Sequence, residues 1–182
     1  MPFRQPSLVL AAAACAACVA TFASVATRAS AATPVSVEAA AQFPLADSGR
    51  NAGGSAQTAF GLDYDLGPQT IVPLRASLHL DDANGSRGNG RINVFAAGGA
   101  VRLTTPIYAG AGLSLVTINV RPDAAAAFTT NATGIATDFY VGERIIGLPG
   151  GTSVSLQADY KKLPRVTGID PSAVALGLRV QL

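Results

Sequence analysis

The sequence predicts an all-β chain that folds as an eight-stranded, antiparallel, up-and-down β-barrel. Three observations lead to this prediction: the chain ends on a strand, strand-like alternation occurs in eight segments, and the connections between these segments alternate in length. In residues 173–182, apolar side chains occupy every second position up to Leu182. A period of two places such side chains on one face of a β-strand.

The first 32 residues are predicted to be a signal peptide that is cleaved near Ala31 or Ala32. Arg4 precedes an uncharged, alanine-rich stretch over 8–26, and residues 29–31 form an A-x-A cleavage site. The alternative is an uncleaved membrane anchor, because 8–26 has nearly the length of a transmembrane helix.

Residues 33–182 are expected to form one barrel domain. Both cysteines, Cys15 and Cys18, lie in the signal segment, so the domain has no disulfide and no thiolate metal site. Lipidation of one of them is an alternative. Removal of Arg4 and Arg28 leaves equal numbers of acidic and basic residues, and no basic run is present. The sequence therefore gives no support to a nucleic-acid partner, and we expect no metal and no cofactor.

Eight segments have strand-like alternation, and clusters of Gly, Pro, Asn and Asp separate them. The segments are 34–45, 59–66, 71–81, 91–103, 107–120, 135–146, 153–161 and 173–182. In the fourth, Val94 and Val101 have opposite parity around Gly98-Gly99, which predicts a β-bulge. In the sixth, the face that carries Phe139 continues to Glu143 near the strand end.

The other five patterned strands (first, second, third, seventh and eighth) each have one apolar face without a charge. Because a Lys or Arg in the middle of a bilayer costs a barrel ~2–4 kcal/mol, this pattern predicts a transmembrane barrel. The apolar faces are Val35, Val37, Ala39 and Ala41; Phe60, Leu62, Tyr64 and Leu66; Val72, Leu74, Ala76, Leu78 and Leu80; Val154, Leu156, Ala158 and Tyr160; and Val174, Leu176, Leu178, Val180 and Leu182.

A soluble periplasmic β-barrel or sandwich that acts as a binding module is the alternative. In it, the apolar faces fill a core and the charged faces meet water. Against it, Lys161 and Lys162 are the only lysines, and the polar faces are rich in Gly, Ala and Ser, as in a narrow interior.

The connections alternate in length, which predicts short periplasmic turns and longer extracellular loops. With eight strands, both ends of the barrel domain then lie on the short-turn side. The short connections are 67–69, 104–106 and 147–152, and the long ones are 47–58, 82–90, 121–134 and 163–172.

Three phrases carry a family resemblance: Pro106-Ile-Tyr-Ala-Gly-Ala-Gly-Leu113, Leu156-Gln-Ala-Asp-Tyr-Lys161, and the run from Gly168 to Leu182. They resemble the small eight-stranded bacterial outer-membrane β-barrels, the group of OmpW, OmpX and the OmpA membrane domain. Two features differ from that group: the last residue is Leu182 in place of phenylalanine, and the chain has no Trp and only 4 Tyr.

The resemblance implies a monomer in the outer membrane of a Gram-negative cell. Its expected partners are outer-membrane lipid and lipopolysaccharide. It also implies recognition by the outer-membrane assembly machinery through the terminal strand that ends at Leu182.

Eight strands enclose an interior that side chains fill, unlike the roughly 16–18 strands of a porin channel. Buried charges must be paired and hydrogen-bonded, so we expect an ion-pair network that plugs the lumen. Its candidate members are Glu38, Asp63, Asp65, Arg75, His79, Asp159, Lys161 and Arg179. The alternative, which comes from the OmpW-like resemblance, is passive passage of small hydrophobic molecules.

An enzymatic role is not expected. Acyl hydrolysis needs a nucleophile with an adjacent base, and His79 is the only histidine. Beside Asp81 and Asp82, it is expected to be a hydrogen-bonded structural residue. The predicted function is therefore a structural or surface-interaction role in the outer membrane.

Overall fold

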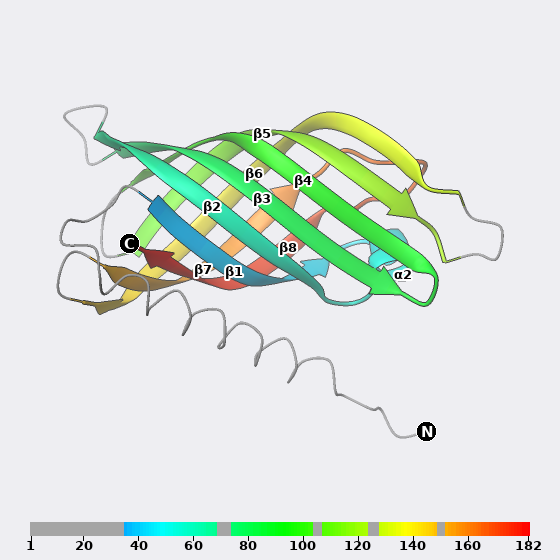
Figure 1. Ribbon diagram of the computed structural model, residues 1–182, viewed down its shortest axis with the longest axis horizontal. Helices are drawn as coiled ribbons and strands as arrows, with labels where there is room; N and C mark the ends of the chain where they lie inside the picture. The colour runs from blue at the N-terminus through cyan, green and yellow to red at the C-terminus, as the bar shows by residue number, and fades with distance from the viewer. Residues whose placement is uncertain (1–34, 69–73, 104–106, 124–127, 149–151) are drawn as a thin grey trace, which may run out of the picture.

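The structure, a computed structural model, describes residues 35–68, 74–103, 107–123, 128–148 and 152–182, without the side chains of 67–68 and 74–76. Eight strands form a closed antiparallel barrel in which each strand pairs with the next and β8 pairs with β1 (Figure 1). The elements are β1 (Val35–Pro44), α2 (Asp47–Gly53), β2 (Gln57–Pro68), β3 (Leu74–Arg87), β4 (Gly90–Leu103), β5 (Ile107–Arg121), β6 (Thr130–Gly147), β7 (Ser153–Lys162) and β8 (Ala173–Gln181). The predicted fold class is confirmed. The predicted signal segment, 1–32, lies outside the described residues.

Among the described side chains, the apolar faces predicted from the alternation lie on the outside of the barrel; Val72 lies outside the described residues, and of Leu74 and Ala76 only the backbone is described. Val37 stands opposite Leu62 on one neighbouring strand and opposite Val180 on the other, so three strands present the same face. Outward side chains in mid-strand are highly exposed, for example Leu113 at 61% and Ile135 at 72%. The alternative in which these faces fill a soluble core is therefore wrong about their direction.

The predicted bulge at Gly98-Gly99 is wrong. The register of β4 with β3 and with β5 runs without a shift through both glycines. Val94 is buried inside the barrel and Val101 is exposed outside it. The two valines differ in parity because part of the interior is itself apolar, so β4 has apolar residues on both faces.

The third connection is shorter than predicted. β3 continues through the Gly- and Asn-rich segment to Arg87, which pairs with Gly90, so only Gly88 and Asn89 form the turn. Gly88 has a φ of 57°, which glycine adopts without strain. The Asn89 N–H donates to Asp123 Oδ1 at 3.0 Å. Ladder hydrogen bonds thus keep this polar segment in a strand, whereas its composition predicted a loop.

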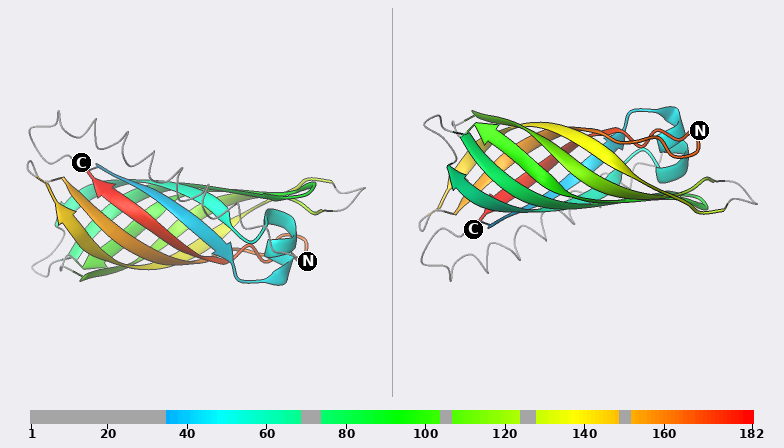
Figure 2. Two further views of the ribbon diagram at one scale, coloured as in Figure 1. Left: turned by 90° about the horizontal axis from the view of Figure 1, so that it is seen from below. Right: turned by 90° about the horizontal axis from the view of Figure 1, so that it is seen from above.

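The remaining long connections lie at one end of the barrel. The first of them contains α2. The connection after Arg121 is shorter than predicted, 122–129, because β6 begins at Thr130. The connection 163–172 has the predicted bounds. At the opposite end, the strands stop at Pro68, Leu103 and Gly147, and the turns predicted there lie largely outside the described residues. We call these two ends the loop end and the turn end. The C-terminus lies at the turn end and α2 at the loop end (Figures 1 and 2).

α2 lies across the loop end of the barrel (Figure 2). This seven-residue helix contacts β1, β3 and β4, and its Ala52 and Gly53 are buried. Within the part of the chain that the structure describes, no helix has the length and apolarity needed to cross a membrane.

Candidate functional site: the barrel interior

The barrel interior has two halves of different chemistry. Toward the turn end, charged and hydrogen-bonding side chains fill it; we call this the polar half. Its members are Glu38, Asp63, Asp65, His79, Asp81, Arg102, Tyr108, Ser114, Asp138, Tyr140, Gln157, Asp159, Lys161 and Arg179. Toward the loop end, the interior is mainly aliphatic, with two buried glutamines, Gln42 and Gln57, among its side chains; we call this the apolar half. Its members are Ala40, Ala52, Ala59, Ala83, Ile92, Val94, Ala96, Val116, Ile118, Val120, Ala136, Leu163, Val166 and Ala175.

Three ion pairs cross the polar half. Arg179 Nη1 lies 2.9 Å from Asp63 Oδ2, and Lys161 Nζ lies 2.6 Å from Asp81 Oδ2. The third pair joins Arg102 Nη2 to Asp65 Oδ2 at 3.2 Å, and both side chains are buried. Asp63–Arg179 joins β2 to β8 and Lys161–Asp81 joins β7 to β3, so these two pairs form only when the barrel closes. The third pair joins β2 to β4 on either side of β3.

Gln157 joins further groups in the polar half. Its Nε2 donates to Glu38 Oε2 at 2.7 Å and to Asp159 Oδ1 at 2.9 Å. Its Oε1 accepts the Tyr108 hydroxyl hydrogen at 2.9 Å. One amide therefore links an aromatic hydroxyl to two carboxylates, as expected where polar groups leave water.

Two glycines make room for the two interior tyrosines. A Cβ at Gly110 would overlap the Tyr140 ring, and a Cβ at Gly142 would overlap the Tyr108 ring. The rings meet edge to face with centroids 6.4 Å apart, and the Arg102 guanidinium lies 5.9 Å from the Tyr108 ring centroid. The Tyr108 and Gly110 pattern on β5 therefore serves packing inside the barrel, because each tyrosine ring lies over a glycine of the neighbouring strand.

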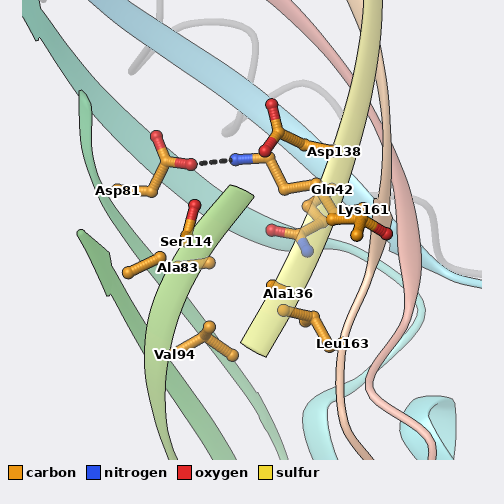
Figure 3. A pocket seen from close by; sticks show the side chains of 11 residues that line it. Gln42, Asp81, Ala83, Val94, Ser114, Ala136, Asp138, Lys161 and Leu163 are labelled. Atoms are coloured by element: carbon orange, nitrogen blue, oxygen red, sulfur yellow. Dashed lines mark hydrogen bonds and ion pairs between the residues drawn. The ribbon is translucent and has the colours of Figure 1, made fainter. Parts of the chain in front are cut away.

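Two cavities of about 20 Å³ each lie along this network. One is lined by Glu38, Asp159 and Arg179, and the other lies at the boundary of the two halves. Figure 3 shows Asp81 and Lys161 facing each other at the second cavity, with Val94 and Leu163 on its apolar side. A space of this size holds about one water molecule.

Several buried polar atoms have no hydrogen-bond partner among the described residues: Gln42 Oε1, Gln57 Nε2, Asp138 Oδ1, Asp159 Oδ2 and Arg179 Nη2. Asp138 and Asp159 line the two cavities. Each cavity therefore has room for about one water molecule beside these carboxylates.

His79 is buried, and its Nε2 lies 2.6 Å from Ser114 Oγ, over Gly98 of the intervening strand β4. The pair has the residue types of a nucleophile and a base. Both side chains are at least 94% buried, however, and the adjacent cavities hold about 20 Å³ each, which leaves no room for a lipid or peptide substrate. The arrangement suits a structural hydrogen bond.

The apolar half is tightly packed and closed by α2. Ile92, Val116, Ile118 and Val120 have no exposed surface. Ala52 of α2 belongs to the same cluster. An aliphatic layer therefore separates the polar half from the loop end.

Residues 163–172 connect to α2 through Asp170. Its backbone N–H donates to Ser48 Oγ at 3.1 Å, and its carboxylate accepts the Ser172 N–H at 3.0 Å. Lys162 Nζ and Arg165 Nε each lie 3.4 Å from Asp170 Oδ2. Desolvation acts to raise the pKa of this carboxyl, but the hydrogen bonds from Ser172 and the two cations outweigh it and lower the pKa to about 2.

The structure brings most of the residues predicted for the lumen together. Glu38, Asp63, Asp65, His79, Asp159, Lys161 and Arg179 all lie in the polar half. For Arg75, only the backbone is described, opposite Arg102 on β4.

The sequence did not predict that Arg102 and Asp138 lie in the interior, or that Gln157 hydrogen-bonds three other interior side chains. The first two lie on strands whose alternation was read as irregular. Placing Val101 and Phe139 outside the barrel would have assigned their neighbours Arg102 and Asp138 to the interior. Among the described residues, no group of three or more His, Cys, Asp or Glu is arranged to hold a metal ion.

Comparison with known proteins places the fold. No family model and no curated protein matches the sequence. Among solved structures, Neisserial surface protein A matches with a TM-score of 0.54 and 15% identity, over 81% of this chain and 96% of that one.

Two further matches have lower scores. The N-terminal β-barrel domain of Pseudomonas aeruginosa OprF matches with a TM-score of 0.47 and 12% identity, over 80% of this chain and 93% of that one. The outer membrane enzyme PagL matches with a TM-score of 0.43 and 14% identity, over 81% and 98%. By its closed eight-stranded topology and its likeness to Neisserial surface protein A, the chain has the fold of the small outer-membrane β-barrels.

Proposed function

We propose that this protein is a non-enzymatic outer-membrane barrel with a plugged lumen and a structural or surface-interaction role. The observation that carries the proposal is the outward belt of exposed apolar side chains on a barrel whose interior is polar at one end. Exposing such a belt to water is unfavourable, and large exposed apolar patches mark surfaces that contact another protein or a membrane. Closure also removes the unpaired strand edge that lipid does not tolerate.

The direct test places a charge on the belt. Leu113, in the middle of β5, is 61% exposed. In lipid vesicles, Leu113→Arg is expected to lower the free energy of unfolding by ~2–4 kcal/mol, whereas Asn131→Arg, beyond the belt, is expected to cost ~0–1 kcal/mol. Equal, small effects of both variants, or a stable monomer without detergent, would contradict membrane insertion.

A second measurement tests the plug. The three ion pairs, the Gln157 bonds and the aliphatic layer under α2 support a lumen closed to ions. In planar bilayers, the purified barrel is expected to give little steady conductance. Large, reproducible open channels would contradict the plug.

Passage of small hydrophobic molecules is the second candidate, and the apolar half favours it. The packed aliphatic side chains and the charged layer beneath them oppose it. Uptake of a hydrophobic solute by cells with and without the protein distinguishes the two, and a faster uptake with the protein would favour passage.

A further inference from the structure

Two arginines face each other on the outside of the barrel near the loop end. Arg91 of β4 pairs directly with Arg121 of β5, and both side chains are exposed. Residues directly opposite in an antiparallel pair have Cβ atoms about 4.5–5.5 Å apart, and like charges at that distance are destabilising. An anion between the two guanidinium groups would remove the repulsion.

Two exposed carboxylates on this part of the barrel, Asp82 and Asp123, each accept a hydrogen bond from another group. Asp82 accepts a hydrogen bond from Asn84 Nδ2 at 2.9 Å, and Asp123 accepts the Asn89 N–H at 3.0 Å. Among the described residues, no ion pair or hydrogen bond involves the side chain of Arg91 or Arg121. The pair is therefore available to an external anion.

A row of asparagines lies directly beside the arginines. The register aligns one asparagine from each of four neighbouring strands on the outward face: Asn84, Asn93, Asn119 and Asn131. Asparagine is depleted in strands, so four aligned side chains are unexpected for stability alone. Amide groups both donate and accept hydrogen bonds, which suits sugar hydroxyls.

The position of this surface along the barrel identifies the source of the anion. Below the row, Phe95 stands between Asp82 and Thr117 on the outward face. The next level down is apolar, with Leu80, Ala97 and Leu115. Along β4, Arg91 lies about 13 Å beyond Phe95, or about 10 Å along the axis for strands tilted ~35–45°. The headgroup layer extends roughly 5–7 Å beyond the hydrocarbon, so the Arg91 backbone lies at or just above the outer edge of that layer. Its long side chain can reach back to the headgroups.

We propose that Arg91, Arg121 and the asparagine row bind the phosphorylated sugar headgroup of an outer-leaflet glycolipid. The guanidinium groups take the phosphate, for which their planar donors are suited, and the amides take the sugar hydroxyls. This inference rests on the proposed membrane location and names the lipid class that this face contacts.

The test is a titration of the full protein, purified in detergent, with diphosphoryl lipid A, with bound lipid counted by native mass spectrometry. Replacing both arginines, Arg91→Gln with Arg121→Gln, is expected to weaken binding about 30-fold, or roughly fivefold for each arginine. Arg144→Gln, an exposed cation near the turn end, is the matched control and is expected to leave the affinity unchanged. Equal affinity of the wild type and the double variant would overturn the proposal.

Two further arms identify the ligand chemistry on the unmodified protein, so the result does not depend on a variant that folds. Dephosphorylated lipid A is expected to bind the wild type about as weakly as diphosphoryl lipid A binds the double variant. If both lipids bound the wild type equally, the role of the phosphate would be overturned. Competition by millimolar inorganic phosphate as effective as that by lipid A would show a free-anion site and overturn the lipid assignment.

The heat-dependent gel mobility of a folded barrel is recorded in parallel. Loss of that shift in the wild type would contradict the membrane barrel itself. A retained shift with unaltered lipid A affinity in the double variant would contradict only the arginine site.

Discussion

The polar half and the apolar half of the interior lie in one barrel but are stabilised differently. In the polar half, side chains from distant strands form ion pairs, as between Asp63 and Arg179. In the apolar half, Ile92 and Ile118 are held by close packing alone. The stability of the polar half depends on each charge having an oppositely charged partner, and that of the apolar half on side chains filling the available volume. Different substitutions should therefore destabilise each half.

The largest effect is expected from breaking an ion pair. Arg179→Met leaves Asp63 as a buried charge without its partner and is expected to lower the free energy of unfolding by ~3–5 kcal/mol. Urea unfolding in lipid vesicles measures it. The double variant with Asp63→Leu removes both charges and is expected to recover most of the loss; a double variant as unstable as the single one would contradict the pairing.

A packing change in the apolar half is expected to have the next largest effect. Ile118 has no exposed surface, so Ile118→Ala should cost about 3 kcal/mol through lost contacts and a cavity, and Ile118→Val about 1 kcal/mol. The same urea unfolding measures both. If the two variants were equally stable, the apolar half would not be tightly packed.

Overpacking beside the interior tyrosines is expected to cost less. A Cβ at Gly110 would overlap the Tyr140 ring, so Gly110→Ala should destabilise the barrel by about 2 kcal/mol. Gly147→Ala, where a Cβ would meet nothing within 4 Å, is the control. Thermal unfolding compares the two, and equal melting temperatures would show that the tyrosine moves freely.

The smallest effect concerns the loop that joins α2. Because the folded pKa of Asp170, about 2, is below its ordinary value of 3.8, its contribution to stability is fully present above pH 4. It is lost as the pH falls from about 4 toward 2. Asp170→Asn should remove this part of the acid dependence, measured as stability against pH. An identical profile for wild type and variant would contradict it.

Strand number and barrel topology were predictable because the alternation recurs in eight segments joined by connections of alternating length. The outward side was predictable because one face of the regular strands carries no charge. The third connection was not. Its Gly and Asn content is typical of a loop, but pairing with β4 keeps residues up to Arg87 in a strand. The interior residues of β4 and β6 were also not predicted, because both faces of these strands carry apolar residues and the alternation of apolar and polar positions is therefore weak.

The sequence by itself determined which side chains share a face, because a period of two is a local property of the backbone. Only the tertiary structure decided which residues become partners. The register around the closed barrel brings Asp63 to Arg179 and sets Arg91 opposite Arg121. It also divides the interior into two halves, because the residues that meet at one height come from all eight strands.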